Sequence, residues 1–368
     1  MERTCLARSL ASRVASGGSD LPPAAHLDAL HQDPAHLDLR HPEPPRPELA
    51  GRDRPLQHTP PRPDDPPRLI EAPLLAELNR RSNAAGWRQV IGHASLILVS
   101  AAVWLQPSLG WGLRLPALLL LGLGLAFGFC AMHECGHRTA FASRSACDAV
   151  AWWAGVLSFY NADFYRRYHQ WHHRYTHQPG LDPELEDPPP SGPAAYLLEL
   201  SGIPWWLGKL RGHWRGLRGD FSGCPYIPAE AAIQVRDSIR RQFAVYGVLL
   251  LASLPAGNGL LLWVWLLPLA LGQPLLRFVL LAEHGGCATS ADGLQNTRTT
   301  LTLAPLRWLM WNMPFHSEHH LYPSLPFHAL AAAHRAIAPW LGHLAPGYLA
   351  VHRHFLEDLS ALAIPERT

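Results

Sequence analysis

The sequence predicts an all-α integral membrane protein, with four transmembrane helices in two hairpins and a cytoplasmic helical cap that carries clustered histidines. Three observations predict this fold class. Charged residues make up 16% of the 368 residues, whereas an average soluble protein has about 25%. Apolar residues gather in runs between residues 90 and 281. Three histidine clusters lie outside those runs, so they would project from the membrane on its surface.

The N-terminal stretch is polar and rich in proline. Residues 1–68 are predicted to form a disordered tail, because prolines such as those at 60–67 prevent helices and central strands. Residues 1–20 lack the continuous apolar core of a signal peptide. The formal net charge of +2 gives no electrostatic reason to expect a nucleic-acid partner. None of the six cysteines forms a C-x-x-C pair, which argues against a thiolate zinc site.

A membrane domain is expected at residues 69–345, followed by a C-terminal helical tail at 346–368. Spanning a bilayer takes about 20 residues, and the apolar runs predict spans at about 88–106, 114–132, 242–257 and 259–281. Pro107 and Gly110 separate the first two spans, and a turn at 255–259 separates the last two. The third span is short and needs flanking residues such as Gln242.

Two hairpins would put residues 133–242 and 282–368 on the same side of the membrane. The first of these segments holds twelve basic residues, whereas Arg114 is the only one near either short turn. The positive-inside rule therefore predicts that the histidines face the cytoplasm. Lys209 is the only lysine in a chain rich in Ala, Leu, Gly and Pro, which suggests a GC-rich bacterial genome and hence the inner membrane. Trp205, Trp206 and Trp214 fit either a membrane surface or an ordinary core.

The histidines recur at helical spacing. A spacing of i, i+3 and i+4 brings imidazoles to one face of a helix, where they can share a metal ion. Nine imidazoles exceed what one zinc site can use, and two iron ions explain the number better. The expected ligands are two in the first cluster, three in each of the others and one at a helix exit: His133, His137, His169, His172, His173, His316, His319, His320 and His284.

Two alternatives compete with a metal-dependent enzyme. Any one cluster could consist of histidines that serve only packing or hydrogen bonding in the core. A metal transporter would need polar residues along its spans, but the predicted spans carry few besides His93, Gln273 and Arg277. The concentration of histidines outside the spans therefore argues against transport.

The clusters read His133-Glu-Cys-Gly-His137, His169-Gln-Trp-His-His173 and His316-Ser-Glu-His-His320. They resemble the three histidine boxes of the membrane fatty acid desaturase superfamily over residues 85–345, with Asn296-Thr-Arg-Thr-Thr300 closest to its bacterial desaturase-like branch. The resemblance implies that the nine histidines hold two non-haem iron ions, with O₂ as co-substrate. No separate catalytic residue is assigned, because the metal centre itself would oxidise the substrate.

The implied reaction puts a double bond into an acyl chain of a membrane lipid or a thioester. Hydroxylases and ketolases of carotenoids or alkanes share the boxes, and some bacterial members act on small molecules derived from amino acids, so these alternatives stay open. The chain has no Rossmann, iron–sulfur or cytochrome b5 motif of its own. We therefore expect a separate electron donor, a ferredoxin or a cytochrome b5-like protein, which could dock on Arg166, Arg167 and Arg174.

Residues near the boxes could support the ligands. Metal-bound histidines usually donate their second N–H to a carboxylate or a carbonyl. The candidates near in sequence are Glu134, Asp163, Asp182, Glu283 and Glu318, while His177 and His328 are expected to be neighbours of the ligands and not ligands themselves. Some superfamily members carry an asparagine four residues before the extra histidine. Here that position is Leu280, and Asn312 is a possible substitute.

Overall fold

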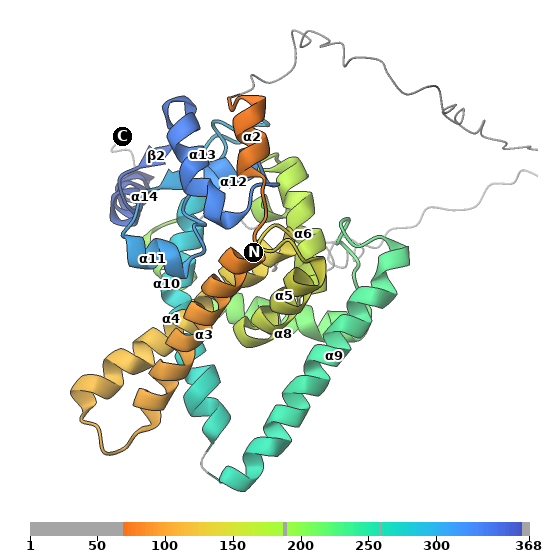
Figure 1. Cartoon of the computed structure of the whole chain (residues 1–368), viewed down its shortest axis with the longest axis vertical. Helices are drawn as coiled ribbons and strands as arrows, with labels where there is room; N and C mark the ends of the chain where they lie inside the picture. Colours follow the sequence, from red (N-terminus) through yellow and green to blue (C-terminus); the bar gives the residue numbers. More distant parts are fainter. Residues whose placement is uncertain (1–68, 187–189, 258, 363–368) are drawn as a thin grey trace, which may run out of the picture. The chain divides into compact units, whose positions relative to one another are not determined.

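The computed structural model describes residues 69–186, 190–257 and 259–362, so the predicted tail at 1–68 lies outside the described residues. That part of the chain is mostly helical (Figure 1). Its α-helices are α2 (Ala72–Leu78), α3 (Asn83–Leu105), α4 (Trp111–Gly136), α5 (Arg144–Ser158), α6 (Ala162–Tyr175), α7 (Pro193–Leu200), α8 (Ile203–Leu217), α9 (Ala229–Ser253), α10 (Leu267–His284), α11 (Ala304–Leu309), α12 (His316–Leu321), α13 (Leu330–Ile337) and α14 (Tyr348–Leu362).

Shorter elements join these helices. They are the 3₁₀ turns η2 (Pro183–Leu185), η3 (Leu254–Ala256), η5 (Phe327–Ala329) and η6 (Ala338–Trp340), the π-helical turn η4 (Leu262–Leu266), and the strands β1 (Thr299–Thr300) and β2 (Leu344–Ala345). The two strands pair in parallel, and no other strand occurs in the described ranges. Strand β1 also contacts α12, so this small sheet braces the helix that carries the third histidine cluster.

Helix α4 lies at the centre of the helical bundle. Nearly every residue from Leu121 to Cys135 is buried, because α3, α5 and α10 pack around it. A helix that is apolar on all sides until its last turn, where His133 lies, has no polar face to turn to solvent, which explains why its neighbours surround it. Glycines allow the closest approach: a Cβ atom on Gly272 of α10 would overlap the backbone carbonyl of Gly122.

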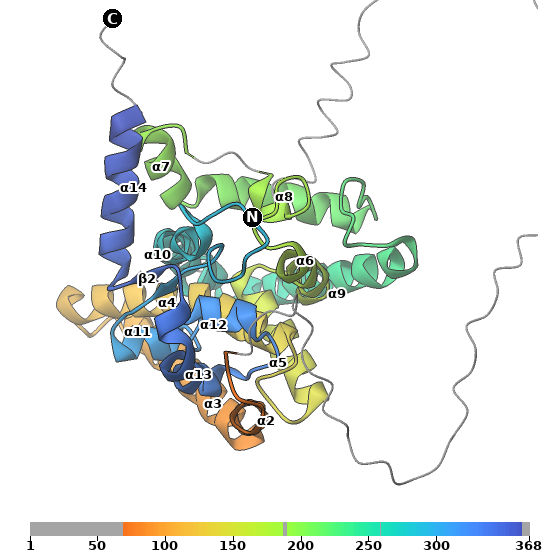
Figure 2. The same ribbon diagram turned by 90° about the horizontal axis from the view of Figure 1, so that it is seen from above.

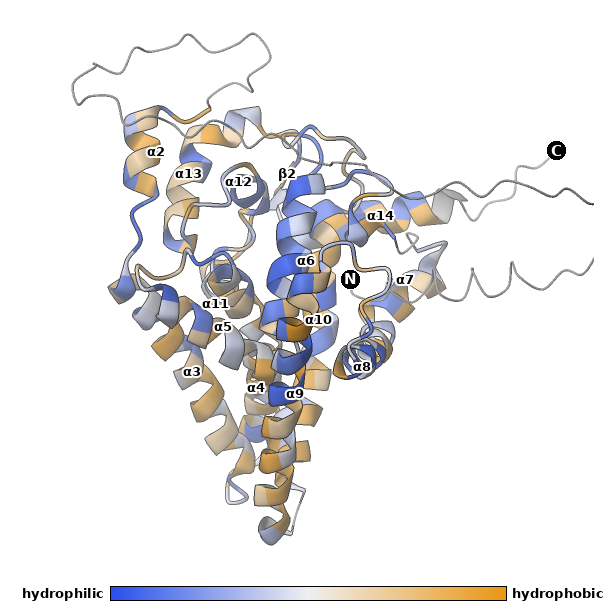
Figure 3. Cartoon of the chain, turned by 90° about the vertical axis from the view of Figure 1, so that its right-hand side faces the viewer, coloured by the Kyte–Doolittle hydropathy of each residue, from blue (hydrophilic) through white to orange (hydrophobic). Residues whose placement is uncertain are grey.

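Within the described residues, three helical segments are long and apolar enough to cross a membrane: Asn83–Leu105, Trp111–Gly136 and Leu262–His284. They overlap the first, second and fourth predicted spans. The predicted third span at 242–257 falls in the second half of α9, whose first half carries charges such as Arg236 and Arg240. Figure 3 shows the apolar colouring concentrated toward the lower ends of α3, α4 and α9, with polar colouring on α6. The fold class is therefore a mostly helical protein with apolar helices of membrane-spanning length.

The second cluster lies on α6, which starts at a side-chain cap. The Asn161 side chain accepts a hydrogen bond from the N–H of Phe164, and its amide donates to Gln242 of α9. The buried Asn161 thus fixes both the first turn of α6 and its contact with α9. The preceding residues Phe159 and Tyr160 end α5 in a left-handed turn, with a φ of 65° at Phe159.

The three tryptophans of the middle segment separate into different environments. Trp205 of α8 is buried, at 2% exposure, whereas Trp214 on the same helix is 62% exposed. Exposed apolar residues follow one face of α8 at Ile203, Leu207 and Leu210. The core expectation is therefore confirmed for Trp205, whereas Trp214 lies on an exposed apolar face of α8 and its place at a membrane surface stays a prediction.

Candidate metal centre

The structure brings all nine predicted histidines together, although they come from α4 and the residue after its end, from α6, from α10 and from α12. Seen from above, those four helices gather around one region (Figure 2). Ring contacts link the histidines of different clusters, with centroids 4.4 Å apart for His133 and His169 and 4.9 Å apart for His172 and His284. Helical spacing therefore predicted which histidines share one face of a helix, and the packing of the helices brings those faces together.

The nine rings divide into two groups. The five-histidine group consists of His133, His137, His169, His173 and His319, whose ligand atoms all lie within 4.8 Å of one another. In it, Nε2 of His173 lies 3.0 Å from Nε2 of His169 and 3.1 Å from Nε2 of His319.

The four-histidine group consists of His172, His284, His316 and His320. Ligand atoms of His172, His284 and His320 lie within 4.8 Å of one another. His316 belongs with them, because its Nε2 lies 3.1 Å from Nε2 of both His284 and His320.

These spacings fit the coordination shell of a metal ion. Imidazole nitrogens bound about 2.1 Å from one ion and at right angles to each other would be about 3.0 Å apart. Several ring nitrogens in the centre are buried without a hydrogen-bond partner, among them Nε2 of His133 and of His137. Buried polar atoms left unpaired in this way are costly unless a ligand satisfies them. The residues present therefore fit two metal ions, one in each group.

Burial also favours the ligand form of these rings. It lowers the pKa of His169, His173, His316, His319 and His320 well below the usual value of 6.5. Neutral imidazole is the form that binds metal, so these rings need no deprotonation before they bind. His172 differs: burial lowers its pKa, but the negative charges of Glu184 and Asp182 outweigh this and raise it to about 9.

Three histidines of the four-histidine group are oriented by hydrogen bonds at Nδ1. His172 donates to both oxygens of Asp182, at 3.0 and 3.1 Å, and His284 donates to the carbonyl of Asn296 at 3.0 Å. The Thr176 hydroxyl donates to the carbonyl of His172 and accepts from Nδ1 of His320 at 3.1 Å. Each bond keeps the proton on Nδ1 and leaves Nε2 free to bind a metal ion.

The predicted carboxylate partners have different roles. Asp182 supports His172 as expected. Glu134 is fully buried, with Oε1 3.3 Å from Nδ1 of His133 and 3.8 Å from Nδ1 of His319. Oε2 of Glu283 lies 3.5 Å from Nε2 of His316.

The other two predicted carboxylates do not support a ligand ring directly. Glu318 accepts hydrogen bonds from Thr299 of β1 and His334 of α13, so it anchors α12 from the side away from the metal ligands. Asp163 makes no hydrogen bond or ion pair with any of the nine histidines among the described residues.

Other residues singled out in the sequence also have structural roles. Asn312 donates to the carbonyl of Phe327 and not toward the histidines. His93 contacts the Gly124 carbonyl through Nε2 and accepts from Trp311, so it joins α3, α4 and the turn before α12. Arg166 donates to the carbonyl of Gly136 and to Asp148, so its guanidinium is already partnered within the protein.

Sequence reasoning missed several supporting groups. Thr176 and the carbonyl of Asn296 orient ligands, and Arg298 donates to the carbonyls of Ala282 and Gly285 at the end of α10. Backbone acceptors leave no residue-type signal. The stretch Asn296–Thr300 was noticed only as a family resemblance, yet it holds His284, α10 and α12 in place together.

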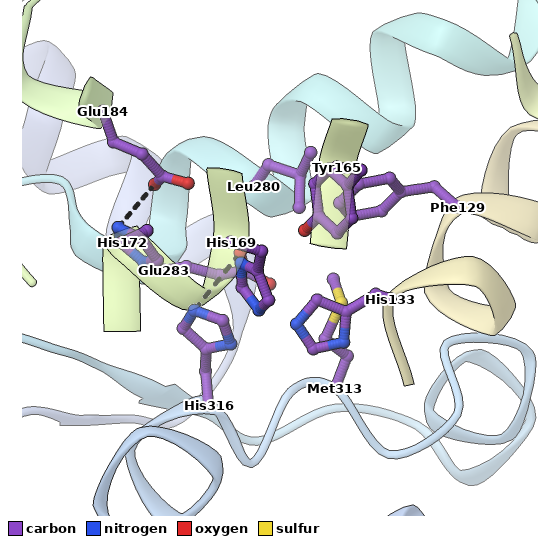
Figure 4. A pocket seen from close by; sticks show the side chains of 10 residues that line it. All are labelled: Phe129, His133, Tyr165, His169, His172, Glu184, Leu280, Glu283, Met313 and His316. Atoms are coloured by element: carbon purple, nitrogen blue, oxygen red, sulfur yellow. Dashed lines mark ion pairs between the residues drawn. The ribbon is translucent and has the colours of Figure 1, made fainter. Parts of the chain in front are cut away.

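A small cavity adjoins the histidines (Figure 4). Its walls combine ring nitrogens and carboxylates with apolar side chains from α4, α10 and the turn before α12. The lining residues are Phe129, His133, Tyr165, His169, His172, Glu184, Leu280, Glu283, Met313 and His316. The cavity is about the size of a water molecule, and its lining combines metal-binding groups with apolar side chains.

Comparisons with known proteins find relatives that are named as lipid desaturases. The chain is 27% identical over 275 residues to the sphingolipid delta(4)-desaturase/C4-monooxygenase DES2 of Rattus norvegicus, covering 70% of this chain and 75% of that protein. The human protein of that name is 28% identical over 305 residues, covering 75% and 81%. An sn-1 oleoyl-lipid 12-desaturase of a Picosynechococcus strain is 31% identical over 145 residues, covering 36% and 41%.

The family model described as fatty acid desaturase matches residues 109–354, which include all nine histidines and most of the described chain. The match begins near the start of α4 and ends within α14. This protein is therefore a member of the fatty acid desaturase family, and an oxidoreductase.

Proposed function

We propose that this enzyme is a membrane-bound, O₂-dependent di-iron desaturase that puts a double bond into an acyl chain of a membrane lipid. The strongest support is the division of nine histidines into two ligand groups beside a cavity with apolar walls. Bound iron would supply the activation of O₂ and the removal of two hydrogen atoms from adjacent methylenes, with two electrons from outside.

The chain's own residues would orient and enclose the reacting groups. Asp182, the carbonyl of Asn296 and Thr176 hold three imidazoles so that Nε2 is free. Phe129, Leu280 and Met313 provide an apolar wall that can pack against methylene groups and exclude water. Because the apolar wall and the histidines face the same cavity, a methylene group placed in it would lie beside the centre.

The names of the relatives support a lipid substrate. They describe desaturation of sphingolipids and of oleoyl lipids. One name also includes C4-monooxygenase, which favours hydroxylation as a second candidate, since both reactions begin with removal of a hydrogen atom from a methylene.

We further propose the four-span topology. In it the second half of α9 completes the third span, the membrane domain extends over 69–345, and the histidines face the cytoplasm of a bacterial inner membrane. Exposed apolar residues on that half of α9, such as Val248 and Leu251, support contact with lipid. A separate ferredoxin or cytochrome b5-like protein would deliver electrons. Arg167 and Arg174 of α6 would form part of the surface on which it docks.

Lipid mass spectrometry of cells that express the enzyme tests the proposal. Wild-type enzyme should yield a lipid species lighter by two hydrogen atoms, and His319→Ala should abolish it because one ligand of the five-histidine group is lost. Iron in the purified proteins should fall in parallel. A species heavier by one oxygen atom would select hydroxylation, and wild-type protein without bound iron would refute the di-iron centre. His354→Ala, on the exposed surface of α14, is the matched control and should change neither.

A further inference from the structure

One face of α10 connects the metal centre to a deeper polar cluster. Gln273, Arg277, Leu280 and His284 follow one another at i, i+4, i+7 and i+11, so they lie on the same side of the helix. His284 belongs to the four-histidine group, and Leu280 lines the cavity (Figure 4). Arg277 lies about 10 Å from His284 along the helix axis, because each residue adds about 1.5 Å.

The two polar residues on this face lack adequate partners. Gln273 is completely buried, and neither its Oε1 nor its Nε2 makes a hydrogen bond. Arg277 is 5% exposed; its Nη2 donates to the Tyr160 hydroxyl at 2.9 Å, but its Nε has no acceptor. The guanidinium of Arg277 also lies 5.3 Å from the centroid of the Trp205 ring, and Glu184 and Glu283 are near enough to attract it, although among the described residues neither forms a direct ion pair with it. A buried guanidinium without a paired anion, beside an unsatisfied amide, is costly unless it serves a ligand.

The surroundings of Arg277 consist mainly of hydrogen-bond donors and aromatic rings. Trp205 of α8 donates to the Tyr160 hydroxyl at 3.0 Å, and the ammonium of Lys209 lies 3.6 Å above the Tyr160 ring. Glu184 and Glu283 are the carboxylates that face the neighbouring cavity. Donors from Arg277 and Gln273 suit an acceptor group with oxygen atoms, such as a carboxylate or an acyl carbonyl.

Aromatic side chains join this cluster to the cavity. The ring of Tyr160 lies 4.8 Å from that of Phe129, and Phe129 lies 5.4 Å from Tyr165. Phe129 and Tyr165 both line the cavity. The cluster also borders α8, whose exposed apolar face and Trp214 suit the membrane surface, where the polar groups of lipids are found.

We propose that Arg277 and Gln273 bind the oxygen-bearing polar end of the acyl substrate and thereby set the position of the double bond from that end. The proposal rests on the desaturase function proposed above. An anchor at a fixed distance from the metal centre selects the same carbon, counted from the polar end, in chains of any length. If the enzyme bound the methyl end of the chain instead, the double bond would keep a constant position counted from the methyl carbon.

The test uses the full-length enzyme in a host without desaturases, fed saturated fatty acids of increasing length. After the double bonds are cleaved, mass spectrometry gives their positions in each lipid class. Product in the free fatty acid indicates that the anchored group is a carboxylate, and product in ester or amide lipids indicates that it is an acyl carbonyl. Wild-type enzyme should keep one position counted from the carbonyl carbon. Arg277→Gln should scatter the position and raise KM about tenfold or more, since hydrogen bonds to a charged group are lost, with bound iron unchanged.

Two further variants separate binding from folding. Gln273→Leu removes the amide while nearly keeping its volume and should also scatter the position. Arg211→Gln, an exposed arginine on α8, is the matched control and should leave position and KM unchanged. A wild-type position constant from the methyl end would overturn the inference but not the desaturase function. Loss of iron in Arg277→Gln would also overturn it, by marking the arginine as structural, whereas no product with any substrate would refute both.

Discussion

Two helix pairs lead the chain toward the histidines, and they pack differently. Helix α3 lies along α4 throughout the first pair, whereas α9 leans away from α10 above their shared turn (Figure 1). Helix α9 packs instead against α8 and α6, and the apolar residues Val248, Leu250 and Leu251 of its second half remain more than half exposed. Helices α4 and α10, one from each pair, pack with their backbones in contact at Gly122 and Gly272.

The difference separates helices that hold the site from helices that border it. His133 lies in the last turn of α4 and His284 is the last residue of α10, so both helices run toward the candidate metal centre. Their mutual contact fixes the distance between a ligand of each group. The exposed half of α9 contributes no ligand, so its packing matters for the membrane and less for the chemistry.

The largest expected effect comes from separating α4 and α10. Gly272→Leu should cost more than about 4 kcal/mol, because even its Cβ would overlap the Gly122 backbone, which cannot move aside without shifting α4. Folded, iron-containing protein should be nearly absent after detergent extraction and size-exclusion chromatography. Gly247→Leu on α9 is the matched control: no atom lies within 4 Å of its Cβ, and the yield should be normal. Equal yields of the two variants would contradict the comparison.

A smaller effect is expected from charges on the exposed apolar faces. Leu98 of α3 is 68% exposed and Leu250 of α9 is 57% exposed. An arginine at the centre of a span opposes insertion by about 2.5–3.5 kcal/mol, so Leu98→Arg should reduce the membrane-inserted fraction strongly. Leu250→Arg should reduce it less, because the short third span lets the side chain reach the interface.

Carbonate extraction of membranes measures both fractions, with Leu98→Ala and Leu250→Ala as controls for lost volume. Full insertion of Leu250→Arg would mean that this half of α9 does not lie in lipid. The four-span topology would then fail, although the tightly packed α3–α4 pair would be unaffected.

The smallest expected effect concerns an ion pair near the end of α4. Asp148 of α5 accepts hydrogen bonds from Arg138 and from Arg166 of α6, whereas Arg167 of α6 and Gln234 of α9 make an exposed contact of 3.4 Å. Partial burial raises the pKa of Asp148, but the two arginines outweigh it and keep the value below the usual 3.8.

Because the pKa of Asp148 is lower in the folded state, the pair stabilises the protein fully at a pH above the unfolded-state pKa. This stabilisation is lost as the pH falls through the folded-state pKa. Asp148→Asn should cost less than about 1 kcal/mol at neutral pH, since the carboxylate is partly exposed. Its Tm in detergent should equal that of wild type at low pH. Gln234→Ala should leave Tm unchanged both at neutral pH and at low pH. A larger loss of Tm in Gln234→Ala than in Asp148→Asn would reverse the order of the two contacts.

The histidines could be predicted from the sequence because helical periodicity fixes which side chains share a face. His316, His319 and His320 needed only their spacing, and His284 only its place at a helix exit. Their assignment to two groups could not be predicted, because it depends on how α4, α6, α10 and α12 cross. Asp182 was predicted to hydrogen-bond one of the nine histidines and does so with His172, whereas Glu318 was predicted to do so but binds Thr299 and His334 instead.

The membrane part shows a similar limit. Apolar runs located the segments of α3, α4 and α10 that could cross a bilayer. They did not reveal that α9 begins at Ala229, since its first half is amphipathic and buries only residues such as Val235 and Ile239. Average hydropathy misses a helix that continues from a polar half into an apolar half.

The glycine contact between α4 and α10 also limits what can pass through the molecule. Where Gly122 meets Gly272 the two backbones touch, with no side chain between them. Neither a water molecule nor a lipid tail can thread between these helices at that level. A route into the cavity from that level has to run around one of them.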